Sequence, residues 1–252
     1  MNFKVIIPAR YASSRLPGKM LAEIGGTTMI EQVVARANES QASEVIVATD
    51  DERIADAVKN ANCRLCMTRK DHESGSDRLA ETVSKLSLQD QEIVVNVQGD
   101  EPLLPGELIN EVAKSLIDDT DAQMSTAARS FDSMSDFQDP NAVKVVINQA
   151  GRAMYFSRAA IPYLRDQDAV QSSVLPNNLV WHHLGIYAYR VGFLKSYQSL
   201  PASAVEQAES LEQLRVLDNG GVIAVHTTDL DVGFGVDTAE DLERARSIFA
   251  ER

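Results

Sequence analysis

The sequence predicts an α/β fold with a doubly wound, mainly parallel sheet. Short segments rich in β-branched residues alternate with longer amphipathic segments along most of the 252 residues. The short segments are almost continuously apolar, which is typical of strands in a parallel sheet that helices cover on both faces. This alternation is interrupted by a region richer in strand-like segments. We therefore expect a single domain over residues 1–252, with a β-rich inserted region for substrate binding and dimerisation at about 125–205.

The N-terminal part alternates strands and helices regularly. Thr28 and Glu31 have the spacing of a capping box, acidic residues from Asp51 suit a helix dipole, and Pro105 suits a first helical turn. The predicted strands cover Phe3–Ile7, Glu44–Ala48, Cys63–Met67 and Glu92–Val97. The predicted helices cover residues 28–39, 51–61, 76–86 and 105–117.

The remainder is less regular before the alternation resumes. Strands are predicted at Met124–Ala128, Ala142–Ile147, Ala153–Phe156, Leu184–Tyr189 and Val222–Val225. Helices are predicted at residues 204–217 and 238–250, and the polar stretch 164–178 is predicted to be a mobile loop.

Composition excludes several classes of protein. The 37 acidic residues outnumber the 24 basic ones and give a net charge of −13, which argues against a broad nucleic-acid surface. The longest apolar runs are far too short to span a membrane, and the N-terminal apolar stretch stops at Pro8 without forming a signal-peptide core. We expect a cytoplasmic protein without nucleic-acid or membrane partners.

The two cysteines, Cys63 and Cys66, form a C-x-x-C. A structural zinc site usually needs four ligands, and the chain has no second pair of cysteines. A redox motif of this kind would open a helix, whereas these residues lie in a predicted strand. Two ordinary buried or half-buried thiols are the better interpretation.

A basic loop, residues 8–19 (PARYASSRLPGK), follows the first predicted strand and holds Arg10, Arg15 and Lys19 without any acidic residue. Arginine forks and a mobile lysine together suit several phosphate oxygens. The loop is not a Walker A motif, because Met20 follows Lys19, and it is not a G-x-G-x-x-G loop. The alternative is a solvated loop with scattered cations, but such a cluster in an acidic chain favours an anionic partner.

Two acidic loops are expected at the same edge, because ligands of open α/β sheets bind outside the carboxyl ends of the strands. Asp100 follows the strand at Glu92–Val97, and Asp237 precedes the last helix. Carboxylates beside bound phosphates need a bridging cation, a part that Mg²⁺ commonly takes. The alternatives are that Asp100 caps a turn and that Asp237 is the N-cap of the last helix. The segment Ser74–Arg78 also follows a strand and suits close approach to a base or sugar.

Eight ordered motifs identify a resemblance that runs from Phe3 to about Arg246. They are PARYASSRLPGK, SGSDRLAE, VNVQGDEP, NAVKVV, YFSRAAIPY, HLGIYAYR, LEQLRVL and GVDTAEDLER. In them the chain resembles the 3-deoxy-manno-octulosonate cytidylyltransferases, the CMP-Kdo synthetases of lipopolysaccharide biosynthesis. The resemblance implies a GT-A-like nucleotidyltransferase fold, a homodimer, Mg²⁺ dependence, and transfer of CMP from CTP to the anomeric 2-hydroxyl of Kdo with release of pyrophosphate.

The same resemblance implies roles for individual residues. Arg10, Arg15 and Lys19 would hold the CTP phosphates, with Arg15, Lys19 and Asp100 central to catalysis. Asp100 and Asp237 would coordinate Mg²⁺. The cytidine would be surrounded by Ala9, Ser74, Gly75 and Arg78. The sugar acid would be contacted by Gln98, Arg158, His183, Tyr187, Glu212 and Gln213.

The chain departs from the family pattern at Met20, where proline is usual, and at His182, where arginine is usual. The second departure removes a possible cation near the sugar pocket. Three alternatives stay open: the same reaction on the 8-amino analogue of Kdo, activation of a sialic-acid-like sugar, and a non-catalytic nucleotide-sugar binding protein.

Overall fold

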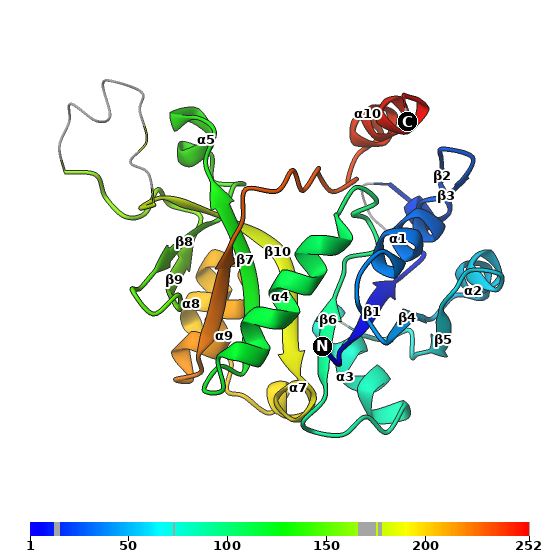
Figure 1. The fold of residues 1–252 in the computed structure, drawn as a ribbon, viewed down its shortest axis with the longest axis horizontal. Helices are drawn as coiled ribbons and strands as arrows, with labels where there is room; N and C mark the ends of the chain where they lie inside the picture. The colour runs from blue at the N-terminus through cyan, green and yellow to red at the C-terminus, as the bar shows by residue number, and fades with distance from the viewer. Residues whose placement is uncertain (13–15, 73, 166–174, 176–177, 252) are drawn as a thin grey trace. The chain divides into compact units, whose positions relative to one another are not determined.

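The computed structural model describes residues 1–12, 16–72, 74–165, 175 and 178–251. Strands and helices alternate along these ranges (Figure 1), and the predicted α/β fold with a mainly parallel sheet is confirmed. The chain divides into a first unit (residues 1–113, 189–198 and 230–252) and a second unit (residues 114–188 and 199–229). One domain with an inserted region at about 125–205 stays a prediction. No helix of the described ranges is long and apolar enough to cross a membrane.

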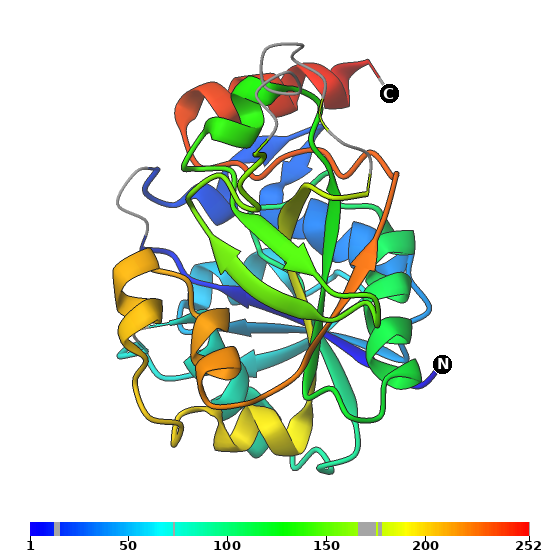
Figure 2. The same ribbon diagram turned by 90° about the vertical axis from the view of Figure 1, so that its left-hand side faces the viewer.

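The first unit contains four parallel strands in the order β6, β1, β4, β5. Their bounds are Ile93–Asn96, Lys4–Ala9, Glu44–Thr49 and Arg64–Met67. The blue to cyan strands β1, β4 and β5 lie side by side in Figure 2. Ile6 in β1 is opposite Ile46 on one side and Asn96 on the other, and all three are buried. The chain therefore adds β4 and β5 on one side of β1 and then returns to add β6 on the other.

This reversal of strand order places the connecting helices on both faces of the sheet. Right-handed crossovers put α1 (Met29–Asn38) and α2 (Glu52–Val58) on one face, where they pack together. The crossover to β6 runs in the opposite direction, so α3 (Gly75–Lys85) covers the other face and packs against α7 (Val191–Tyr197). The unit also contains α10 (Ala239–Ala250).

Short elements complete this part of the chain. The basic loop ends in the 3-10 turn η1 (Lys19–Leu21), and a small hairpin follows, formed by β2 (Glu23–Ile24) and β3 (Thr27–Thr28). The predicted capping box of Thr28 and Glu31 is confirmed at the start of α1. Helix α4 (Gly106–Asp118) begins directly after Pro105, one residue later than predicted, and extends into the second unit.

The second unit is richer in antiparallel pairing. In it β7 (Met124–Ser130) pairs in parallel with β11 (Ile223–Thr227). The antiparallel strands are β8 (Lys144–Ile147), β9 (Ala153–Ser157) and β10 (Trp181–Arg190), with β8 between the other two. Strand β10 continues for its last two residues into the first unit.

Several elements differ from the sequence prediction. The predicted helix at 204–217 is wrong, because the structure has two helices there, α8 (Ala204–Glu209) and α9 (Gln213–Asp218). Ser210 has φ 52° and ends the first of them in the left-handed region, where an α-helix cannot continue. Helices α5 (Met134–Gln138) and α7 were not predicted. The predicted mobile loop at 164–178 lies mostly outside the described residues.

Candidate nucleotide and sugar site

The basic loop and the first acidic loop leave neighbouring strands of the first unit. Strands β1 and β6 flank the point where the strand order reverses, and ligands of open α/β sheets bind outside the carboxyl ends of strands at such a point. Ala9 is the buried last residue of β1, and Arg10 follows it with an exposed side chain. Gln98 and Asp100 lie in the turn after β6. Arg15 lies outside the described residues.

Lys19 brings the two predicted metal ligands together. Its Nζ lies 2.5 Å from Oδ2 of Asp100 and 3.0 Å from Oδ1 of Asp237, and it also donates to the carbonyl of Val236 at 3.3 Å. The backbone N–H of Val236 donates to the carbonyl of Asp100 at 2.8 Å, which joins the two acidic loops. The side chain of Lys19 is 9% exposed, so its charge depends on these carboxylates rather than on water. The three loops that the sequence places at this edge therefore meet at one ammonium group.

The interpretation of Asp237 as a helix cap is wrong. The N-cap of α10 is Thr238, whose hydroxyl accepts from the N–H of Asp241 while the Asp241 carboxylate accepts from the N–H of Thr238. Because this capping box satisfies the helix end, the carboxylate of Asp237 is directed to Lys19 instead. The carboxylate of Asp100 likewise contacts Lys19 and is not used only to hold its own turn.

The local electrostatics reflect this concentration of acidic groups. Burial lowers the pKa of Lys19, but its contacts with Asp100 and then Asp237 outweigh that effect and the pKa is raised. Glu101 was not singled out from the sequence. Burial, followed by the charges of Asp100 and Asp237, raises the pKa of Glu101 to about 7. The edge therefore favours positive charge and resists further negative charge.

The two converging carboxylates fit a hard divalent cation. The described ranges contain no group of three or more His, Cys, Asp or Glu residues that could hold a metal ion without other ligands. Mg²⁺ is usually bound by one or two carboxylates together with substrate phosphates and water, which matches a pair of aspartates beside a basic loop. A cation, the Lys19 ammonium, already lies between the pair. Asp100 and Asp237 are therefore suitable ligands when a nucleotide supplies the remaining oxygens.

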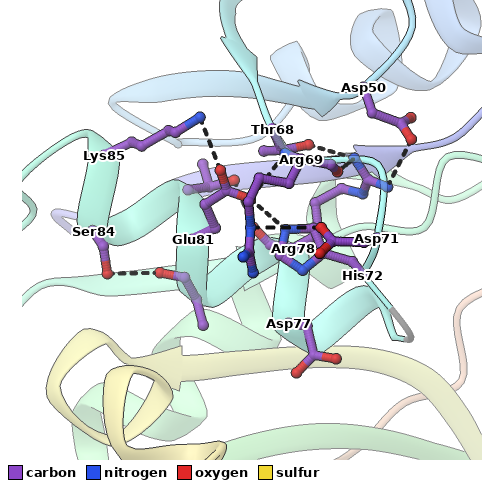
Figure 3. Close-up of polar contacts among 12 residues, drawn as sticks. Asp50, Thr68, Arg69, Asp71, His72, Asp77, Arg78, Glu81, Ser84 and Lys85 are labelled. Atoms are coloured by element: carbon purple, nitrogen blue, oxygen red, sulfur yellow. Dashed lines mark hydrogen bonds and ion pairs between the residues drawn. The ribbon is translucent and has the colours of Figure 1, made fainter.

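The predicted cytidine segment lies at the start of α3. Ser74 is the N-cap and forms a capping box with Asp77, and a side chain added at Gly75 would meet nothing within 4 Å. Arg78 is only 4% exposed. Its guanidinium contacts the Thr68 hydroxyl and lies 3.5 Å from the carboxylate of Asp50 (Figure 3). Arg78 thus ties α3 to the ends of β4 and β5, and its main contacts are with protein groups.

A second cluster on α3 is centred on Glu81 (Figure 3). The Glu81 carboxylate accepts from the backbone N–H of Arg69 at 3.0 Å, contacts His72 Nε2, and lies 2.8 Å from Lys85 Nζ. Burial raises the pKa of Glu81, but these partners outweigh it and lower that pKa to about 2. The chain between β5 and α3 is therefore fastened to the helix by an ionised carboxylate.

The predicted sugar ligands divide between the units. Gln98 lies in the first unit, and Arg158, His183, Tyr187, Glu212 and Gln213 lie in the second. Arg158 Nε donates to the carbonyl of Glu209 at 2.7 Å. His183 and Tyr187 lie on β10 with ring centroids 5.4 Å apart. Glu212 is exposed at the start of α9, whereas Gln213 is buried.

The departures from the family pattern at Met20 and His182 each have clear structural surroundings. Met20 is buried in η1, and a Cβ at Gly99 would lie 2.9 Å from its sulfur, so Met20 packs directly on the turn that carries Asp100. His182 stacks on Phe131 with centroids 5.0 Å apart. Burial, followed by the charge of Arg129, lowers the pKa of His182 to about 4, so this position carries no cation at neutral pH.

The cysteines lie around β5. Cys63 is half-buried and Cys66 is buried, and both are free thiols. Burial raises the pKa of each thiol, which keeps them protonated at neutral pH.

Comparison with known proteins covers the whole chain. A family model described as cytidylyltransferase matches residues 4–227. The chain is 50% identical to a 3-deoxy-manno-octulosonate cytidylyltransferase of Vibrio parahaemolyticus over 252 residues, with all of both chains covered. It is 49% identical to the protein of the same name from Alcanivorax borkumensis, over 98% of each chain.

Solved structures agree with these sequence relationships. A CMP:2-keto-3-deoxy-manno-octonic acid synthetase complexed with CTP matches with a TM-score of 0.90 and 41% identity, over 99% of this chain and 98% of that one. A cytidylyltransferase from Leptospira borgpetersenii has a TM-score of 0.65 at 16% identity, over 100% of this chain and 87% of that one, which shows the fold alone.

Proposed function

Because the chain belongs to the family of 3-deoxy-manno-octulosonate cytidylyltransferases, we propose that it transfers CMP from CTP to the sugar acid Kdo. The anomeric 2-hydroxyl of Kdo attacks the α-phosphorus of CTP. A bond forms between that oxygen and the phosphorus, the bond from the α-phosphorus to the bridging oxygen of pyrophosphate breaks, and the hydroxyl loses its proton. The observation that carries this proposal is the convergence of Lys19, Asp100 and Asp237 beside the basic loop.

Positioning and charge neutralisation dominate phosphoryl transfer of this kind. Arg10 and Arg15 supply planar forks for phosphate oxygens, and Lys19 supplies a point charge. The buried position of Lys19 supports this assignment, because a charge shielded from water acts more strongly on a phosphate. The three cations hold the triphosphate and stabilise the charge that develops on pyrophosphate as it leaves.

Asp100 and Asp237 would hold the magnesium ion. When bound, Mg²⁺ supplies Lewis-acid chemistry at phosphate and lowers the pKa of a coordinated hydroxyl. The two aspartates orient this chemistry, because the contact between Val236 and Asp100 joins their loops.

Around the base, the residues divide between direct contact and support. Ala9, Ser74 and Gly75 bring the backbone close to the cytidine, and the open space at Gly75 supports such an approach. Arg78 holds the start of α3 in place through its contacts with Thr68 and Asp50, and so positions these residues. The sugar acid is bound by Gln98, Arg158, His183, Tyr187, Glu212 and Gln213.

The chain also assembles as a homodimer through the inserted region. Large apolar side chains are exposed in that region, and Met154 (62% exposed) and Tyr163 (83% exposed) are the most accessible of them. A surface of this kind suits a second copy of the chain. Light scattering of the purified protein measures the mass, and a monomeric mass at micromolar concentration contradicts this assignment.

The decisive experiment is Asp100→Asn assayed with CTP, Mg²⁺ and either Kdo or its 8-amino analogue. Loss of one charge contact of this kind costs on the order of a hundredfold or more in rate, and we expect turnover to be nearly abolished while the fold is kept. Asp90→Asn is the matched control, because Asp90 pairs with Lys195 at 2.7 Å on the surface. Near-normal pyrophosphate release by folded Asp100→Asn protein would overturn the assignment. Tight CTP binding by the wild type without turnover on either sugar would indicate a binding protein instead.

A further inference from the structure

The hydroxyl of Thr126 lies at the centre of a buried polar contact in the second unit. Thr126 is fully buried in β7. Its Oγ1 lies 2.9 Å from His183 Nε2, 2.8 Å from the carbonyl oxygen of Ile186 and 3.1 Å from that of Leu184. All three partners are on β10, so one hydroxyl serves a ring nitrogen and two backbone oxygens.

The chemistry of these partners decides the direction of each hydrogen bond. A threonine hydroxyl has one proton and two lone pairs, and a carbonyl oxygen only accepts. A proton pointed at His183 would leave both carbonyl contacts, at 2.8 Å to Ile186 and 3.1 Å to Leu184, without a hydrogen, whereas a proton pointed at Ile186 leaves only the longer contact without one. The proton therefore goes to a carbonyl, and Thr126 accepts from His183. Nε2 of His183 must then carry a hydrogen.

The surroundings of His183 keep the ring neutral and hold it in place. Its edge meets Phe156 with centroids 4.9 Å apart, and Tyr187 lies on the same strand at 5.4 Å. Burial, followed by the neighbouring His182, lowers the pKa of His183 to about 3. Its backbone N–H donates to the carbonyl of Val143 at 2.8 Å. A neutral imidazole with hydrogen on Nε2 has an unprotonated Nδ1, which accepts hydrogen bonds.

We propose that Thr126 is a positioning residue that fixes His183 in the Nε2–H form, so that Nδ1 accepts a hydrogen bond from a hydroxyl of the sugar acid. This rests on the proposed function, which places His183 at the sugar. It follows that different residues bind the hydroxyl groups and the carboxylate of the sugar acid. His183 selects a donor group on the polyol part of the substrate and does not neutralise its carboxylate, which is left to cationic groups such as Arg158.

The first test is spectroscopic and needs no substrate. Protein with ¹⁵N-labelled histidine is recorded by NMR at neutral pH, and His183→Gln assigns the signal among the four histidines. We expect His183 to show a pyrrole-type Nε2 and a pyridine-type Nδ1. Thr126→Val keeps the shape of the side chain but removes the hydroxyl, and we expect a mixture of both ring forms. Thr126→Ser restores the hydroxyl and should restore the wild-type spectrum. A wild-type ring protonated on Nδ1, or a spectrum that Thr126→Val leaves unchanged, would overturn the proposal.

The second test is kinetic. Loss of one well-placed hydrogen bond should raise the KM for Kdo roughly three- to thirtyfold in Thr126→Val, with the KM for CTP within about twofold of wild type. Thr126→Ser should recover the wild-type KM. Thr82→Val is the matched control for loss of a buried hydroxyl, because Thr82 donates to the carbonyl of Arg78 in its own helix. It should leave the KM for Kdo and the His183 spectrum unchanged.

The two tests separate the possible failures. An unchanged KM for Kdo in Thr126→Val, with the expected ring form in the wild type, overturns the contact between Nδ1 and the sugar. A wild-type protein with no activity on CTP and Kdo overturns the proposed function itself. The NMR spectrum still decides in that case whether Thr126 sets the form of His183.

Discussion

At the scale of single residues, Lys19 links the basic loop to both acidic loops. Its ammonium group contacts Asp100 and Asp237, which are 81 and 218 residues away in the chain. Two carboxylates that converge without a cation would repel each other. Lys19 therefore stabilises the approach of the two acidic loops to each other, and the proposed function also assigns it to the CTP phosphates.

Replacement of this cation should have a measurable effect on stability and metal response. In Lys19→Met we expect a loss of roughly 1–3 kcal/mol in the free energy of unfolding, because the carboxylates lose their buried partner. We also expect Mg²⁺ to raise the melting temperature of the variant more than that of the wild type. Turnover should fall on the order of a hundredfold.

Thermal unfolding with and without Mg²⁺ measures the stability of each variant and the rise in melting temperature that Mg²⁺ causes. Lys4→Met is the control, because it breaks the pair of Lys4 with Glu92 at 3.0 Å, away from the acidic loops. Equal responses of Lys19→Met and wild type to Mg²⁺ would show that the carboxylates do not form the metal site.

At the scale of secondary-structure elements, α3 organises the predicted cytidine segment. Arg78 contacts the Thr68 hydroxyl, and Glu81, three residues later on the helix, accepts from the N–H of Arg69 and contacts His72. Both side chains therefore hold the chain that leads from β5 into α3. The Ser74 cap fixes the point at which the helix starts. The position of the predicted nucleotide contacts thus depends on one helix and on the contacts that Arg78 and Glu81 make with the chain before it.

The lowered pKa of Glu81 gives a pH-dependent prediction. Its pKa is about 2 in the folded protein, below the ordinary value of 4.5, so the ionised form stabilises the fold above pH 4.5 and this contribution disappears as the pH falls toward 2. In Glu81→Gln we expect the free energy of unfolding to be lower than in the wild type by a constant amount above about pH 5.5, on the order of 3 kcal/mol at most. Below pH 4.5 this difference between the variant and the wild type should become smaller. The KM for CTP should rise while the KM for Kdo stays near wild type.

Denaturant unfolding between pH 3.5 and 7.5 measures the loss. Glu39→Gln is a suitable control, since Glu39 forms an exposed pair with Arg36 that is worth little. If the difference in the free energy of unfolding between Glu81→Gln and the wild type does not vary with pH, the charge of Glu81 is not what holds the chain between β5 and α3 against the helix.

The elements also show what a sequence can and cannot reveal. The start of α1 is predictable because the capping box of Thr28 and Glu31 is local. The break at Ser210 is not, because no glycine or proline marks it and the turn depends on the fold. The loops after β1 and β6 are predictable as lying at one edge of the sheet, because each follows a strand of the parallel sheet. The Asp237 loop is not predictable in this way, because the strand before it, β11, lies at the far end of the strand order. That Lys19 contacts both aspartates, and that Thr238 rather than Asp237 caps α10, depends on tertiary packing.

At the scale of the whole molecule, the protein is a strongly acidic chain that is proposed to bind an anionic nucleotide. Its net charge is −13, and two of its carboxylates lie where the triphosphate is expected. CTP alone must overcome this repulsion with the cations of the basic loop. Mg²⁺ alone has only two protein ligands and a competing ammonium group. Each ligand should therefore bind much better when the other is present.

Thermal stability reports this coupling directly, because a ligand that binds only the folded chain stabilises it by mass action. We expect CTP with Mg²⁺, at about a hundred times the dissociation constant, to add about 2.7 kcal/mol and raise the melting temperature by roughly 5–10 °C. CTP with EDTA, and Mg²⁺ without CTP, should each raise the melting temperature only slightly. The rise with CTP and Mg²⁺ together should be larger than the sum of these two separate rises. In Asp100→Asn the combined shift should shrink toward that of CTP with EDTA, while Asp90→Asn should match the wild type. Equal shifts for CTP with EDTA and CTP with Mg²⁺ would contradict a metal-bridged nucleotide at Asp100 and Asp237.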